Sequence, residues 1–374
     1  MDIRLKVDAL RRFSGFEFDS DIFVGMLLAI TGKQHLILTV SRDAYLDFAQ
    51  QMTLLIGSNI FGFFTVSLNC TAATTTDEFA SMLLGSAKPS LASQLSPALD
   101  PNMVPPRPSN KPLAQSGKLP NLVVIRNLDK SSNYVQAQLL EILRSKKMTT
   151  ASGVYMAPSP FVVIPVLSKT NMRLNLFPYL LDHFFMSHDY EPPNSDESHI
   201  VFGQWTPPIE LPSPKQTALF NEKEIDLLQK LSSSVVINVD IRRNIHDIIV
   251  FLRMHRAVSG GVSARASRDF ELLVRCLCPL HGISFATPSI VAIAARKTYS
   301  HRISITDPEL ERSVLYGSDV EAVKRFLQQW TGEAVLEDIL DTVPAPICQT
   351  TAFRSFLSFA LARNLCSHST DAAS

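Results

Sequence analysis

Residues 251–267 read Phe-Leu-Arg-Met-His-Arg-Ala-Val-Ser-Gly-Gly-Val-Ser-Ala-Arg-Ala-Ser. The pair Gly260-Gly261 separates two runs with helical apolar spacing, and the second run begins at Ala264 with Arg265 in its first turn. Free backbone N–H groups, the helix macrodipole and a guanidinium all favour negative charge at such a position. The stretch therefore predicts a helix start that suits an anion.

The chain around this stretch has helical apolar spacing from residue 220 to residue 346. Asn221 followed by Glu224 has the spacing of a capping box, which marks a helix start. We therefore predict an all-α domain over 220–346, and we assign 347–374 to a C-terminal helix and tail. The helices expected inside the domain are 241–255, 264–280, 287–301 and 320–330.

Residues 1–190 alternate between strand-like and helix-like runs instead. Alternation of this kind predicts an α/β domain, a parallel sheet with helices on both faces. Pro165 is expected to bend or end its strand, because proline cannot donate to a sheet ladder. Strands are expected at 35–40, 61–68, 121–125 and 161–167, helices at 22–30, 44–55 and 134–144, and a hairpin at 147–157.

Two proline-rich segments interrupt this pattern. Residues 86–120 contain eight prolines among serines and alanines, which predicts a long surface insertion inside the α/β domain. Residues 191–219 are also rich in proline and are expected to link the α/β domain to the helical domain.

The composition bounds the classes of partner and compartment. The 374 residues carry 35 basic and 35 acidic side chains, so there is no general attraction to nucleic acid or anionic lipid. The five cysteines are scattered, which predicts neither disulfides nor a metal site and fits a reducing compartment. The uncharged run 52–70 is interrupted by polar residues and is expected to be buried rather than membrane-spanning. We predict a cytoplasmic or other intracellular protein without nucleic-acid or membrane partners.

Several motifs occur in the order found in one family of nucleotide-fold proteins. The segment at 261–266, Gly-Val-Ser-Ala-Arg-Ala, resembles the lid motif of the MoxR and magnesium-chelatase branch of the AAA+ P-loop ATPases. The resemblance implies an α/β AAA+ core followed by a helical lid, in an oligomeric assembly. Further matches are Val-Gln-Ala-Gln-Leu-Leu-Glu at 135–141, Leu-Leu-Asp-His-Phe at 180–184, Phe-Ala-Thr-Pro-Ser-Ile-Val at 285–291, His-Arg-Ile at 301–303 and the run 335–346.

The positions that should hold nucleotide depart from the family pattern. A P-loop needs glycines for the phosphates, a lysine, and a Ser or Thr for magnesium. After the strand at 35–40, Leu46 falls at the lysine position and Asp47 at the Ser/Thr position, and no glycine lies between Lys33 and Gly57. An aspartate at that place repels phosphate, so tight binding of magnesium-nucleotide is not expected.

The second nucleotide strand departs as well. The family has Asp-Glu at its end, for magnesium and for activating water. Here the strand ends in Arg126-Asn127, a cation that opposes metal binding and an amide that cannot take a proton. Asp129 comes later and is expected to cap a helix rather than bind a metal.

Three further site positions follow from the resemblance. Ser168 corresponds to the polar residue of the sensor strand, and His183 to an arginine that reaches a neighbouring subunit. Arg265, the lid residue that reaches the nucleotide phosphates in the family, is retained; the alternative is that it pairs with Asp269 four residues on.

Two hypotheses about function follow. The first is a non-hydrolysing AAA+ scaffold or regulatory subunit of an oligomer, with no resident cofactor and no catalytic residue. The alternative is a divergent ATPase that binds ATP and magnesium and is coupled to metal chelation or protein remodelling. A third arrangement is an active AAA+ partner that presents nucleotide to an interface completed by His183 and Arg265.

Overall fold

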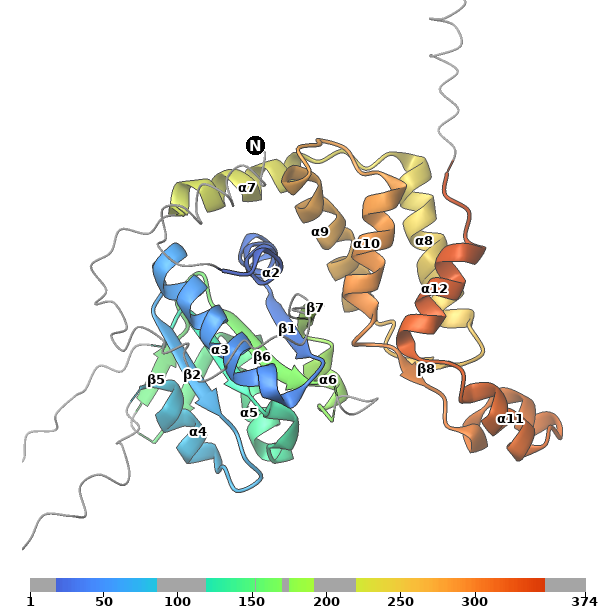
Figure 1. Ribbon diagram of the computed structural model, residues 1–374, viewed down its shortest axis with the longest axis horizontal. Helices are drawn as coiled ribbons and strands as arrows, with labels where there is room; N and C mark the ends of the chain where they lie inside the picture. Colours follow the sequence, from blue (N-terminus) through green and yellow to red (C-terminus); the bar gives the residue numbers. More distant parts are fainter. Residues whose placement is uncertain (1–17, 86–118, 152, 170–174, 192–219, 347–374) are drawn as a thin grey trace, which may run out of the picture.

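The computed structural model describes residues 18–85, 119–151, 153–169, 175–191 and 220–346. Most of the predicted insertion at 86–120, nearly all of the linker at 191–219 and the whole segment 347–374 lie outside the described residues. Figure 1 shows an α/β layer at one side and a group of helices at the other.

A five-stranded parallel sheet forms the centre of the α/β part. Its strand order is β2-β3-β6-β1-β7, so β1 lies between β6 and β7. The strands are β1 (His35–Val40), β2 (Thr65–Asn69), β3 (Leu122–Arg126), β6 (Val162–Ser168) and β7 (Phe184–Tyr190). The predicted parallel sheet with covering helices is confirmed, because β1 and most of β3 and β6 are buried on both faces.

The helices of this part connect the strands. Lys33 is left-handed, at φ 52°, and ends α2 between the helix expected at 22–30 and the strand expected at 35–40. The α-helices are α2 (Ser20–Gly32), α3 (Leu46–Leu55), α4 (Thr76–Leu83), α5 (Asn133–Ser145) and α6 (Pro178–Leu181), with a π-helical turn at Ile56–Ile60. The predicted hairpin is formed by β4 (Lys147–Thr150) and β5 (Gly153–Met156).

Two local expectations for strands are wrong. Of the bend or end expected at Pro165, the end is wrong, since β6 continues to Ser168. Pro165 pairs with Ile125 of β3, and the pairing of β6 with β1 begins one residue later, at Val166. The residue without a backbone N–H therefore lies just before the β6–β1 hydrogen bonds begin. The strand expected at 61–68 begins only at Thr65 and is not fully buried, because β2 is an edge strand.

The second part is helical, as predicted. A short antiparallel pair, β8 (Val258–Gly260) with β9 (Ser304–Ile305), joins its halves and was not expected from the sequence. Gly261 has φ +99°, and a Cβ atom here would overlap the carbonyl oxygen of Arg302, so the second glycine of the pair is required by shape. The α-helices are α7 (Glu222–Ser234), α8 (Val239–Met254), α9 (Ala264–Leu280), α10 (Pro288–Tyr299), α11 (Val320–Leu327) and α12 (Gly332–Thr342).

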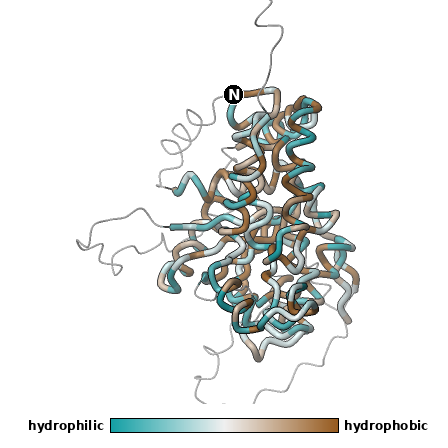
Figure 2. Tube along the Cα trace, turned by 90° about the vertical axis from the view of Figure 1, so that its right-hand side faces the viewer, coloured by the Kyte–Doolittle hydropathy of each residue, from teal (hydrophilic) through white to brown (hydrophobic). Residues whose placement is uncertain are grey.

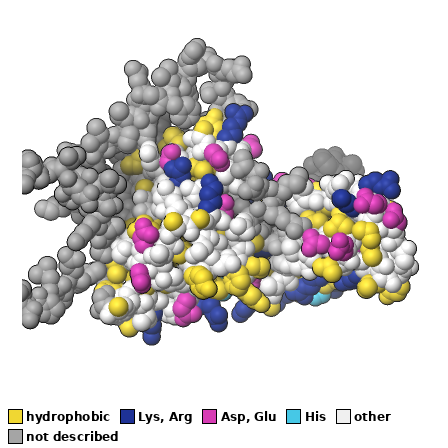
Figure 3. Space-filling model, turned by 90° about the horizontal axis from the view of Figure 1, so that it is seen from below, with side chains coloured by type: hydrophobic (Ala, Val, Ile, Leu, Met, Phe, Trp, Pro, Cys, Tyr) yellow, Lys and Arg dark blue, Asp and Glu magenta, His cyan; other side chains and the backbone are white. Residues whose placement is uncertain are grey.

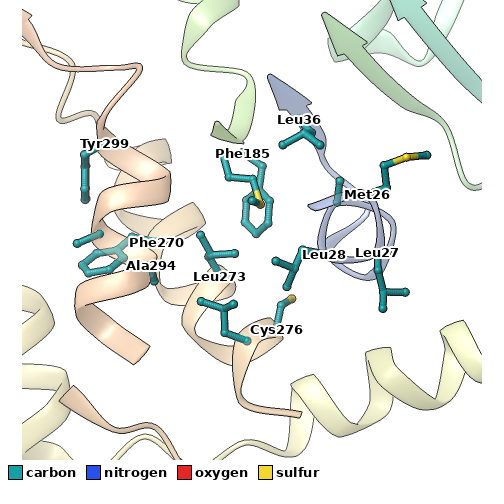
Figure 4. Close-up of a cluster of buried hydrophobic side chains, with 14 of the residues drawn as sticks. Met26, Leu27, Leu28, Leu36, Phe185, Phe270, Leu273, Cys276, Ala294 and Tyr299 are labelled. Atoms are coloured by element: carbon teal, nitrogen blue, oxygen red, sulfur yellow. The ribbon is translucent and has the colours of Figure 1, made fainter. Parts of the chain in front are cut away.

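One continuous core joins the two parts. Apolar side chains of α2 and β7 pack against α9, as Figure 4 shows for Leu28, Phe185 and Leu273. Hydrophobic stretches of the chain gather through the middle of the molecule, with hydrophilic stretches toward its outside (Figure 2). The helical part therefore lies against the β7 edge of the sheet, and this placement positions Arg265 at the start of α9.

Candidate nucleotide site and a cationic cleft

The carboxyl ends of the parallel strands meet at one edge of the sheet, where ligands of open α/β sheets bind. The structure brings four of the predicted site residues to this edge. Arg126 ends β3, Asn127 follows it, Ser168 ends β6 opposite Val40 of β1, and Asp47 lies in the first turn of α3. Leu46 begins the same helix, but its side chain is buried in the core, which explains an apolar residue at that position.

The two charged residues that depart from the family pattern contact each other. Arg126 Nη1 donates a hydrogen bond to Asp47 Oδ1, and the two side chains form an ion pair across 79 positions of sequence. The Asp47 side chain is 65% exposed, so this pair contributes only about 0.2–1 kcal/mol to folding. Its consequence is local: the Arg126 guanidinium neutralises the Asp47 carboxylate at this edge of the sheet.

The turn after β3 differs from the expectation in one respect. Asn127 is left-handed, at φ 54°, and its Nδ2 donates to Asn69 Oδ1 at 3.0 Å. The predicted helix cap at Asp129 is wrong: Ser132 caps α5 by accepting from the Val135 N–H. Asp129 lies in a short 3-10 turn, where its backbone carbonyl accepts from Asn175. Among the described residues, no three His, Cys, Asp or Glu side chains group as metal ligands would.

A polar cluster that the sequence did not suggest lies beside Ser168. Lys169 Nζ binds Asp189 Oδ2 at 3.2 Å and Glu333 Oε1 at 2.7 Å, so it joins β7 to the start of α12. Burial lowers the pKa of Lys169, but its hydrogen bonds to Glu333 and Asp189 outweigh this and raise it. Thr39 donates a hydrogen bond to the same Asp189 carboxylate. Thr39 and Asp189 are neighbours because β1 pairs with β7, whereas Glu333 reaches Lys169 from the first turn of α12.

His183 and Arg265 lie at the opposite edge of the sheet. His183 precedes β7, which starts beside His35 at the beginning of β1, and Arg265 Nη2 lies 3.5 Å from Gln34 Oε1 just before that strand. The six residues of β1 separate the two edges by about 17 Å at roughly 3.3 Å per residue. The seven predicted site residues are therefore divided between two places rather than assembled into one.

A cleft of about 740 Å³ lies at this second edge. It is lined by Leu140, Leu143, Arg144, Phe177, Tyr179, Asp182, His183 and Arg265. Its acidic lining residue is already engaged, because Asp182 Oδ1 accepts from Ser263 Oγ at 2.7 Å and lies 3.9 Å from Arg302 Nε. Burial and the nearby Arg265 lower the pKa of His183. The cleft thus combines apolar walls with Arg265 at the start of α9 and Arg144 in the last turn of α5, which suits an anion.

The alternative pairing of Arg265 with Asp269 is present but loose. The Arg265 Nε and Asp269 Oδ2 atoms are 3.9 Å apart, whereas Arg302 Nη2 binds the same carboxylate oxygen at 2.6 Å. Arg265 Nε has no hydrogen-bond partner among the described residues. The Asp269 carboxylate is paired mainly with Arg302, so the Arg265 guanidinium can still bind another anion.

Comparison with known structures defines the fold. A candidate ATPase from Cytophaga hutchinsonii superposes with a TM-score of 0.62 over 92% of this chain and 96% of its own, at 14% identity. The fold is an α/β AAA+ core followed by a helical domain, as the sequence predicts. No family model matches the chain.

Among curated proteins the chain is similar to yeast proteins named maintenance of telomere capping protein 2. The relative from Kluyveromyces lactis is 32% identical over 112 residues, 29% of this chain and 41% of the relative. The one from Lachancea thermotolerans is 32% identical over 145 residues, 33% of this chain and 51% of the relative. The one from Saccharomyces cerevisiae strain S288c is 32% identical over 123 residues, 32% of this chain and 33% of the relative. The matched segments span from a third to about half of these relatives' length.

Proposed function

We propose that this chain is a non-hydrolysing AAA+ subunit that acts as a scaffold or regulatory member of an oligomeric assembly. The ion pair between Asp47 and Arg126 carries this proposal. A magnesium ion held at this edge would need both positions for oxygen ligands, and hydrolysis would need a carboxylate base in place of Asn127. Here one position supplies a cation that binds the other, and the loop after β1 offers no glycine cradle.

The cleft at the second edge supports the oligomeric part of the proposal. Arg265 and His183 lie too far from the carboxyl edge to meet a ligand bound there in the same chain. A phosphate presented by a neighbouring subunit would instead find Arg265, Arg144 and the start of α9 together at the cleft. We therefore propose that the cleft faces the nucleotide of an AAA+ partner, within the MoxR and magnesium-chelatase branch.

Calorimetric titration with ATP, with and without magnesium, tests the loss of the nucleotide site. We expect no binding at the carboxyl edge tighter than about 100 μM, roughly −5.5 kcal/mol. The variant Arg265→Ala shows where any heat that appears comes from. Tight binding that is kept in Arg265→Ala would not involve the cleft, and it would overturn the proposal and favour the divergent ATPase. Weak heat lost in Arg265→Ala would place the phosphate in the cleft and agree with it.

We further propose that the process served by this assembly is telomere capping, from the names of the curated relatives. We expect expression of this chain to restore capping in a Saccharomyces cerevisiae strain lacking its relative, and Arg265→Ala to restore it less well. Equal failure of both proteins despite normal expression would contradict this part. Basic and acidic side chains are interspersed on the face seen in Figure 3, so this face offers no broad basic surface to DNA, and we propose a protein partner.

The cellular compartment follows from this second proposal. A capping role requires access to the nucleus, in addition to the cytoplasm suggested by composition.

Three described cysteines, Cys70, Cys276 and Cys278, are free thiols. Burial raises the pKa of Cys276 to about 12, as expected for a core residue rather than a reactive or metal-binding one. No described helix is long and apolar enough to cross a membrane.

A further inference from the structure

Lys146 and His35 form an unusual pair beside the cleft. Lys146 follows α5 in a left-handed conformation, at φ 55°, and its Nζ lies 3.2 Å from His35 Nε2. His35 is the first residue of β1 and is only 2% exposed, whereas Lys146 is partly accessible. The chain thus places an amine and a buried imidazole in hydrogen-bond contact.

The other ring nitrogen of His35 fixes which atom donates. The Val163 backbone N–H donates to His35 Nδ1 at 3.2 Å, so Nδ1 carries no proton. A neutral ring with an unprotonated Nδ1 has its proton on Nε2. That Nε2–H points at Lys146 Nζ, and a hydrogen bond between them requires a lone pair on the nitrogen of the lysine. An ammonium has none, so the contact selects the neutral amine.

The charges around the pair act in the same direction. The cation that acts on both groups is Arg265 from α9, and the titratable His183 from the segment before β7 also faces His35. Lys146 has no carboxylate partner among the described residues. Burial and then Arg265 lower the pKa of Lys146. The ring of Phe161, with its centroid 5.6 Å from Nζ, is the group that favours the ammonium. An amine desolvated beside another cation is the form in which lysines become nucleophiles.

We propose that Lys146 is a covalent site for small aldehydes that carry an anionic group. The hydrogen bond from His35 Nε2–H to Nζ breaks, and the freed lone pair attacks the aldehyde carbon. One N–H proton of the amine passes to the aldehyde oxygen to give a carbinolamine. Loss of the hydroxyl group and of the second N–H proton as water then forms the imine. No electrons are exchanged with another reactant. Arg265 and the cationic lining of the cleft raise the local concentration of anionic aldehydes over neutral ones. This inference goes beyond the proposed function and does not depend on nucleotide or on an oligomer.

Reductive alkylation of the full-length chain tests the proposal, with Lys147 as a control in the same molecule. Lys147 is the adjacent residue and is exposed. The protein is treated with glyoxylate and cyanoborohydride at pH 7, and the two lysines are quantified by peptide mass spectrometry. We expect Lys146 to be labelled at least tenfold faster than Lys147, and this ratio to fall toward one near pH 10. Labelling of Lys146 that is no faster than that of Lys147 at pH 7 would overturn the proposal.

Two comparisons distinguish the reactivity of the Lys146 amine from its preference for anionic aldehydes. Formaldehyde, a neutral aldehyde, should give a smaller ratio of Lys146 to Lys147 than glyoxylate gives. An equal ratio would remove the anionic group from the proposal. Arg265→Gln should lower the labelling of Lys146 at pH 7 several-fold while leaving that of Lys147 unchanged, and unchanged labelling of both would show that Arg265 does not activate the amine. Circular dichroism of the variant checks that it is folded.

Discussion

Replacing Asp269 by alanine is expected to lower the free energy of unfolding by about 3–5 kcal/mol. Its carboxylate accepts from Arg302 Nη2 at 2.6 Å, and the Arg302 side chain is 1% exposed. Burial raises the pKa of Asp269 and outweighs the opposing effect of Arg302. The intact ion pair therefore adds little free energy of folding beyond what the two hydrated charges have in the unfolded chain. Its loss is costly because it leaves a buried guanidinium with backbone carbonyls and the more distant Asp182 carboxylate.

Urea unfolding at pH 7 measures this loss, and Asp226→Ala is the matched control. Asp226 is an exposed aspartate on α7 in the same domain, so its removal should change the free energy of unfolding by less than about 0.5 kcal/mol. A loss below 1 kcal/mol in Asp269→Ala would show that Arg302 finds water or another carboxylate, and that the contact between α9 and β7 does not depend on this pair.

Acidification from pH 7 to pH 5 is expected to destabilise the fold by about 4 kcal/mol through two buried histidines. Burial and Lys297 lower the pKa of His188 to about 4, and burial and Arg302 lower that of His301 to about 3, from 6.5. Both rings stay neutral in the folded chain at pH 5 but are protonated when it unfolds. Their contribution to the free energy of unfolding is therefore complete above pH 6.5. It is lost as the pH falls, at about 1.4 kcal/mol per pH unit for each ring. His35 acts in the same direction.

Urea unfolding at several pH values between 7 and 5 checks this slope. In His301→Gln, the amide can still donate to the Phe184 carbonyl that His301 Nε2 contacts at 3.0 Å, but it cannot be protonated. The slope below pH 6.5 should therefore fall by about 1.4 kcal/mol per unit in this variant. His246→Gln changes an exposed histidine and should leave the slope as it is. A wild-type stability that is flat between pH 7 and pH 5 would contradict the neutral state of both rings.

The sequence by itself determined most of the elements and showed that the P-loop residue types are missing after the first strand. The run at 35–40 is β1 because it is a short, mostly apolar run between turn signals. The amphipathic run at 134–144 is α5 within one residue at each end. The absence of glycine after β1 and the cation at Arg126 are also visible in the sequence, since phosphate and magnesium require particular residue types there.

Only the tertiary structure decided which of these residues meet. Asp47 and Arg126 were predicted as two separate defects, and their ion pair depends on β3 lying where α3 begins. Arg265 was expected to reach the phosphates of a nucleotide, but the packing of α9 against α2 and β7 places it at the opposite edge of the sheet, beside His183 and Lys146. Local propensity fixes a helix or strand from neighbouring residues, whereas strand order and domain placement come from burial of surfaces distant in sequence, which no local pattern encodes.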